Sequence, residues 1–136
     1  MATIKNLIIC EDVKNEIQSD NTIVPQIIEE LSVVQPYAVP GNYSFSVFCE
    51  VEGVKAETDD NIQMFITAPN GSKLFETDKI FFPNNVESDC GFCVDLRNFL
   101  FLSEGDYKIK VILNEISITE KILSVKAKTT GGVGND

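Results

Sequence analysis

Two cysteines separated by two residues lie in the segment Asp89-Cys90-Gly91-Phe92-Cys93-Val94-Asp95. Redox dithiols and zinc sites both use this spacing, but a redox dithiol also needs its first cysteine at a helix N-terminus, where the helix dipole lowers the thiol pKa. The residues after Cys93 show no helical period. They alternate as in a strand, with Cys90, Phe92, Val94 and Leu96 on one face and Cys93 on the other. We therefore predict that the two thiols point apart, unless a bulge at Gly91 changes the alternation.

A zinc site would need all four cysteines of the chain, because the sequence contains no histidine. Cys10 ends an apolar run and Cys49 lies on the apolar face of a predicted strand, so neither belongs to a second Cys-x-x-Cys pair. Free cysteine commonly behaves as a small buried hydrophobic residue. We expect reduced thiols that bind no metal, and a chain that needs no cofactor.

The absence of histidine also removes the Ser-His-Asp and Cys-His nucleophile systems, so carboxylates are the remaining candidates for chemistry. None of the acidic clusters has the spacing of a calcium loop. Asp59, Asp60, Glu104 and Asp106 would bind Ca²⁺ only if their loops met at one end of the fold. We predict that the chain is not an enzyme and keep Ca²⁺ or carbohydrate binding as an alternative. The clusters are Glu11 with Asp12, Glu57 with Asp59 and Asp60, and Glu104 with Asp106.

Most of the chain alternates with a period of two, which is typical of half-buried strands. Residues 43–51 place Tyr43, Phe45, Val47, Cys49 and Val51 on one face. Residues 61–67 are followed by Pro69-Asn70-Gly71 and residues 73–76, which predicts a hairpin. A second hairpin is predicted where Asn114-Glu115 separates the strand from Tyr107 to Leu113 from the strand of residues 116–125.

These strands predict one antiparallel immunoglobulin-like β-sandwich over residues 1–126, with a closed barrel as the alternative. Tyr107 follows Gly105-Asp106 at the start of a strand, where immunoglobulin-like domains have a tyrosine that bonds to nearby backbone. Residues 22–35 remain ambiguous, because Ile27, Ile28 and Leu31 have helical spacing while Pro25 and two valines favour a strand. The polar, glycine-rich residues 127–136 are expected to form a flexible tail.

The chain has 136 residues and a formal net charge of −10. This charge repels nucleic acid and anionic lipid, so we expect neither as a partner. The first apolar run, from Leu7 to Cys10, is too short for a signal peptide, and every longer apolar segment is interrupted by polar residues. We expect a cytoplasmic protein.

The segment Ile8-Ile9-Cys10-Glu11-Asp12-Val13-Lys14-Asn15-Glu16 resembles the opening of a DUF6941-like family of small bacterial proteins. These proteins begin with a hydrophobic strand, then Cys-Glu-Asp-Val-Arg and a nearby Glu; this chain has Lys14 in place of the Arg. The resemblance implies a β-sandwich in a bacterial or phage setting and no catalytic residues. The residues themselves predict that Glu11-Asp12-Val13 is a strand-to-turn junction whose carboxylates accept backbone N–H bonds.

Binding to another protein is the function that this sequence favours. Phe48, Phe65 and Ile112 are apolar residues on otherwise polar strand faces, and we predict that they mark the contact. The partner would be a second copy of the chain or a protein to which the chain is an accessory subunit. The alternative to such a module is an acidic inhibitor that mimics nucleic acid in a basic groove.

Overall fold

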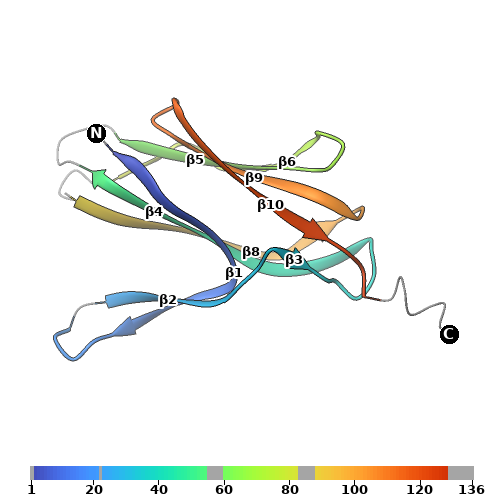
Figure 1. The fold of residues 1–136 in the computed structure, drawn as a ribbon, viewed down its shortest axis with the longest axis horizontal. Helices are drawn as coiled ribbons and strands as arrows, with labels where there is room; N and C mark the ends of the chain where they lie inside the picture. Colours follow the sequence, from blue (N-terminus) through green and yellow to red (C-terminus); the bar gives the residue numbers. More distant parts are fainter. Residues whose placement is uncertain (1, 22, 55–59, 83–87, 129–136) are drawn as a thin grey trace.

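The computed structural model describes residues 2–21, 23–54, 60–82 and 88–128, and these form a sandwich of two β-sheets (Figure 1). Sheet A has the order β2-β1-β4-β8, and sheet B has the order β3-β10-β9-β5-β6, with β7 paired to β5. The strands of sheet A are β1 (Thr3–Ile17), β2 (Ile23–Glu30), β4 (Gly41–Val54) and β8 (Ser88–Phe101). Those of sheet B are β3 (Val33–Val34), β5 (Asn61–Thr67), β6 (Lys73–Glu76), β7 (Ile80–Phe81), β9 (Gly105–Leu113) and β10 (Ser117–Val125).

The predicted antiparallel sandwich is confirmed, and the alternative of a closed barrel is not formed by the described strands. All strand pairs are antiparallel except the short pairing of β3 with β10. Both predicted hairpins form. Asn114 and Glu115 both have positive φ, as tight hairpin turns require. No helix of the described residues is long and apolar enough to cross a membrane.

The inner faces of the two sheets form the core. The inner residues of β5 are Ile62, Met64 and Ile66, as their alternation predicted, and all three are buried. Tyr107 is buried against Phe101, with ring centroids 5.0 Å apart. Its hydroxyl donates a hydrogen bond of 2.7 Å to the carbonyl of Ser103, four residues upstream. This confirms the predicted tyrosine anchor at the start of β9.

Two sequence predictions in the N-terminal third require correction. Glu11-Asp12-Val13 is not a junction with a turn, because β1 continues through it to Ile17. The predicted carboxylate bond does form, since the Val13 N–H donates to Asp12 Oδ1 at 2.9 Å. The ambiguous segment is extended: it forms β2 and β3, and Pro25 is tolerated because β2 is an edge strand.

The first residues of the predicted tail carry backbone hydrogen bonds. The Ala127 N–H donates to Glu104 Oε2 at 2.8 Å, and the Lys128 N–H donates to the Pro36 carbonyl at 2.9 Å. Residues 129–136 lie outside the described part of the chain, as do Glu57 and Asp59.

Candidate protein-binding site

Phe65 and Ile112, two of the three predicted contact residues, lie on the outer face of sheet B. Their neighbours along β5 and β9 point into the core, so the alternation of both strands turns Phe65 and Ile112 outward. Both side chains are half-buried and line one hollow of about 250 Å³. Thr67, Lys73 and Lys110 complete its lining. The structure therefore brings these two predicted residues together.

The adjacent strand β10 extends this apolar surface. Ile118 pairs with Ile112 across the β9–β10 ladder, and its side chain is 59% exposed. Ile122 lies two outward positions further along β10, beyond the exposed Glu120, and is 43% exposed. We call Phe65, Ile112, Ile118 and Ile122 the sheet B face. Ile118 and Ile122 were not among the predicted contact residues, although their alternation with the buried Leu123 and Val125 indicates that they face outward.

Two lysines line the hollow of the sheet B face. The Lys73 ammonium lies 4.7 Å from the centroid of the Phe65 ring, a cation–π geometry, and also forms an ion pair of 3.1 Å with Glu76. Lys110 contributes the other charge of the lining. Both charged groups that line the hollow are therefore positive in a chain whose net charge is −10.

Phe48 is not part of this surface, and the prediction that it is an exposed contact residue is wrong. It lies on β4 in sheet A, and its side chain is only 8% exposed. The reason is Gly91 on the neighbouring strand β8. A Cβ at Gly91 would lie only 3.1 Å from the Phe48 ring. Because glycine has no side chain, the Phe48 ring can pack against β8 at this position.

The same region answers the question raised by the Cys-Gly-Phe-Cys segment. Residues 90 to 96 of β8 pair with β4 without a register shift at Gly91, so the predicted alternation holds. Cys49 belongs to the core, and Cys90 is a partly buried residue that packs against the core. Cys93 is exposed on the outer face. Cys10 pairs with Ser46 on that outer face. All four are free thiols, and they do not meet at one point.

A polar network occupies the outer face of sheet A around these thiols. The Ser46 hydroxyl donates to Asp95 Oδ1 at 2.6 Å, and Arg97 forms ion pairs with Asp12 at 3.3 Å and with Asp95 at 3.7 Å. Partial desolvation, followed by the Asp95 carboxylate, raises the pKa of the Cys93 thiol to about 11. Cys93 therefore keeps its proton at neutral pH, which disfavours thiolate chemistry at this position.

The structure separates the acidic residues of the Ca²⁺ alternative. Asp60 lies beside the end of β9, where its carboxylate accepts a hydrogen bond of 2.9 Å from Asn114. Glu104 and Asp106 lie at the start of β9, which is about 26 Å away for a strand of this length. The condition for the Ca²⁺ alternative, that Asp60 meets Glu104 and Asp106, is therefore not fulfilled. In the described ranges, no three potential metal ligands form a cluster.

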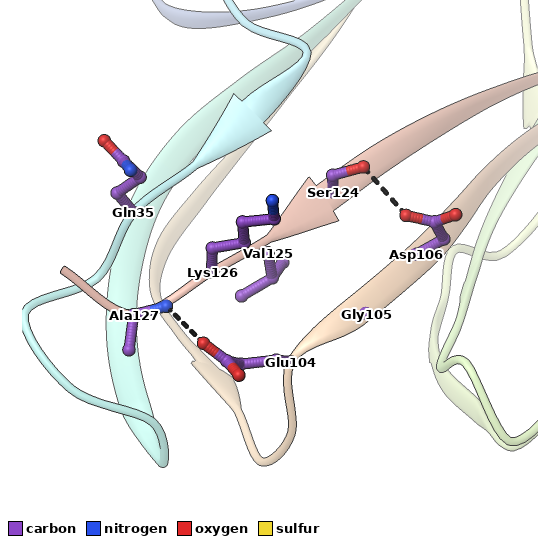
Figure 2. A pocket seen from close by; sticks show the side chains of 8 residues that line it. All are labelled: Gln35, Glu104, Gly105, Asp106, Ser124, Val125, Lys126 and Ala127. Carbon is purple, nitrogen blue, oxygen red and sulfur yellow. Dashed lines mark hydrogen bonds between the residues drawn. The ribbon is translucent and has the colours of Figure 1, made fainter. Parts of the chain in front are cut away.

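Glu104 and Asp106 line a separate hollow of about 390 Å³ at their end of the sandwich (Figure 2). Figure 2 shows that both carboxylates already accept hydrogen bonds, Glu104 from the Ala127 N–H and Asp106 from the Ser124 hydroxyl, each at 2.8 Å. These bonds join the start of β9 to the end of β10. Their evident role is to hold the two strand ends together.

The strands of the two sheets differ in charge. Those of sheet A contain nine acidic and three basic residues, whereas those of sheet B contain three acidic and four basic residues. The acidic excess of the strands therefore lies in sheet A, and the sheet B face is electrically distinct from it.

No family model and no curated protein matches the chain. Among solved structures, the C-terminal domain of wzt is 16% identical, with a TM-score of 0.49 over 92% of this chain and 73% of that one. An immunoglobulin-like protein from Pseudomonas aeruginosa is 16% identical, with a TM-score of 0.46 over 90% and 98%. A CARDB domain from Pyrococcus furiosus, in complex with di-metal ions, is 13% identical, with a TM-score of 0.43 over 90% of both chains. These matches do not assign the chain to a family; what the structure itself shows is a two-sheet β-sandwich.

Proposed function

We propose that the chain is a non-enzymatic protein-binding module that uses the sheet B face. The observation that carries this proposal is the hollow lined by Phe65 and Ile112 beside the exposed side chains of Ile118 and Ile122. Contiguous exposed apolar surface with a polar border is typical of protein-binding sites. The polar border carries both charges, since Lys73 pairs with Glu76 and Lys110 lies across from Glu120 in the β9–β10 ladder. The proposal therefore specifies an apolar centre for the partner surface and no particular charge.

A photo-crosslinking amino acid at position 118 tests this proposal in cells of the native host. A matched control carries the same group at Glu52, which is exposed on β4 in sheet A. We expect a discrete protein adduct from position 118 and none from position 52. Absence of an adduct at 118, or the same adducts from both positions, would refute the sheet B face as the binding site.

An acidic inhibitor that occupies a basic groove is the second candidate, and the acidic excess of sheet A favours it. In that case the adduct would form at position 52 rather than 118, with a basic nucleic-acid-binding protein. Its yield would fall steeply with added salt, because exposed charge pairs are screened. The two candidates therefore give opposite results in one experiment.

A further inference from the structure

We propose that Asn70 is a self-modification site, at which the backbone of the chain displaces the side-chain amide and the residue becomes aspartate or isoaspartate. Asn70 lies with Gly71 in the turn of the hairpin formed by β5 and β6 (Figure 1). The chemistry belongs to this turn alone and needs no partner protein, so it is independent of the proposed function.

The reaction needs only water as a co-reactant. The backbone nitrogen of Gly71 loses its proton to solvent and forms a bond to Cγ of Asn70, and the bond between Cγ and Nδ2 breaks as ammonia leaves with a proton from solvent. The product is a succinimide ring. Water then opens the ring at either carbonyl: cleavage between the nitrogen and Cγ gives aspartate, and cleavage between the nitrogen and the backbone carbonyl carbon gives isoaspartate. No group is oxidised or reduced.

Gly71 leaves the attacking nitrogen uncrowded. Asn70 and Gly71 are both exposed, and a Cβ added at Gly71 would meet no heavy atom within 4 Å. A side chain at this position would crowd the ring as it closes, and glycine has none. Asn70 is the only asparagine of the sequence that a glycine follows. The obstacle to ring closure is therefore smallest at Asn70.

A backbone hydrogen bond holds the carbonyl group that is attacked. The Ser72 N–H donates to Oδ1 of Asn70 at 2.9 Å. Attack on Cγ places negative charge on this oxygen, so the N–H stabilises the developing charge as a donor of an oxyanion hole does.

A second backbone hydrogen bond opposes the reaction. The Gly71 N–H donates to the carbonyl of Ala68 at 2.9 Å, and this bond must break before the nitrogen can attack. Gly71 is exposed, and exposed turns open locally without unfolding of the whole domain. The bond therefore slows the reaction but does not prevent it.

Asn61 and Asn114 provide internal references in the same chain. Asn61 is only 8% exposed. The Asn114 side chain is held at both ends, since its nitrogen donates to Asp60 at 2.9 Å and its oxygen accepts from the Asn61 N–H at 2.8 Å. Neither residue is followed by glycine. Both should keep their amides while Asn70 loses its own.

Modification changes both the length and the charge of the turn. Isoaspartate adds one atom to the main chain, inside a turn that the Ala68 N–H closes by donating to the Ser72 carbonyl at 2.8 Å. Either product also replaces a neutral amide with a carboxylate. Lys73 follows directly, pairs with Thr67 and lines the hollow of the sheet B face. The modified turn therefore borders that hollow.

The test follows the folded full-length chain during incubation at pH 7 and pH 9. By peptide mass spectrometry we expect Asn70 to become aspartate and isoaspartate while Asn61 and Asn114 stay unchanged. The rate should rise about tenfold per pH unit, because the attacking nitrogen must first lose its proton. Isoaspartate is the decisive product, since direct hydrolysis of the amide by water gives aspartate alone.

Two variants test the ring-closure step. Gly71→Ala places a methyl group beside the attacking nitrogen and should slow conversion at least about tenfold, provided that circular dichroism shows a folded domain. Asn70→Gln keeps the amide on a longer side chain, which would have to close a larger ring, and should give no modified product on the same timescale.

Three results would overturn the inference. One is a folded chain that keeps the Asn70 amide, whether or not the same chain unfolded in urea loses it. The second is loss of the Asn61 or Asn114 amide as fast as that of Asn70. The third is conversion of Asn70 to aspartate without isoaspartate.

Discussion

Cys90 and Cys93 have the spacing of a redox dithiol, but the strand turns them to opposite faces of the sheet, which disfavours dithiol chemistry. The strand turns Cys90 toward the core and Cys93 outward, beside the Asp95 carboxylate at 3.7 Å. A thioredoxin-like site lowers a thiol pKa, whereas here desolvation and a carboxylate raise the pKa of Cys93.

We predict that Cys93 reacts slowly with iodoacetamide at neutral pH. Because the pKa of its thiol is raised to about 11, the rate should increase about tenfold per pH unit between pH 8 and about 10 as the thiolate fraction grows. Peptide mass spectrometry of the labelled chain measures this rate. Asp95→Asn removes the carboxylate and should speed labelling at pH 8. A rate that levels off below about pH 9 would contradict the prediction.

Gly71 and Gly105 both have positive φ, but only Gly105 is also closely packed against another residue. Gly71, in the turn between β5 and β6, has φ of 91°, and an added Cβ would meet nothing within 4 Å. Gly105, at the start of β9, has φ of 133°, and its Cβ would lie 2.9 Å from Cγ of Pro69. The first position constrains only the backbone, while the second also constrains packing.

Gly105→Ala should therefore destabilise the domain more than Gly71→Ala does. We expect a loss of about 1 kcal/mol in the free energy of unfolding for Gly71→Ala, from backbone strain alone. For Gly105→Ala we expect about 3 kcal/mol, since a steric overlap with a rigid ring is added to the strain. Urea denaturation measures both. Equal losses would mean that the contact with Pro69 relaxes without cost.

The elements that the sequence predicted well are those with one buried and one exposed face. The alternation in residues 61–67 and 107–113 reports directly which side chains meet the core. Ile27, Ile28 and Leu31 have helical spacing, yet residues 23–30 are extended as β2 because they pair with β1. The strand with which these residues pair lies outside the short stretch of sequence in which a helical or strand period is recognised.

The candidate site was predicted in part for the same reason. Phe65 and Ile112 lie on faces whose opposite side is buried, so their outward direction followed from the alternation. Phe48 lies on an equally polar face, but its burial depends on Gly91, which is distant in sequence and adjacent only through the β4–β8 register. The extent of β1 was missed because Glu11-Asp12 looks like the polar end of a strand.

The whole molecule should lose stability in alkali. Burial raises the pKa of the Cys49 thiol from 9.0 to about 12, so the folded state holds this proton after the unfolded chain has released it. The resulting stability is fully present below about pH 9 and is lost as the pH rises toward about 12, at up to about 1.4 kcal/mol per pH unit.

Cys49→Ala isolates this contribution. The variant should be less stable than wild type at pH 7, because a buried side chain is truncated. Between about pH 9 and 11 its free energy of unfolding should fall less steeply, by up to about 1.4 kcal/mol per pH unit. Denaturant titrations at several pH values measure the two slopes. Parallel slopes would show that Cys49 does not hold its proton in the folded state.

Binding through the sheet B face is the central claim at the scale of the whole molecule, and native mass spectrometry tests it most directly. Wild type and Ile118→Asp would be purified gently from the native host, with Ile116→Asp as the matched control. We predict that wild type and the control retain a second copy or another protein, that Ile118→Asp is a bare monomer, and that all three have similar melting midpoints. A bare wild-type monomer, or an Ile118→Asp variant that keeps the same partner, would contradict the account.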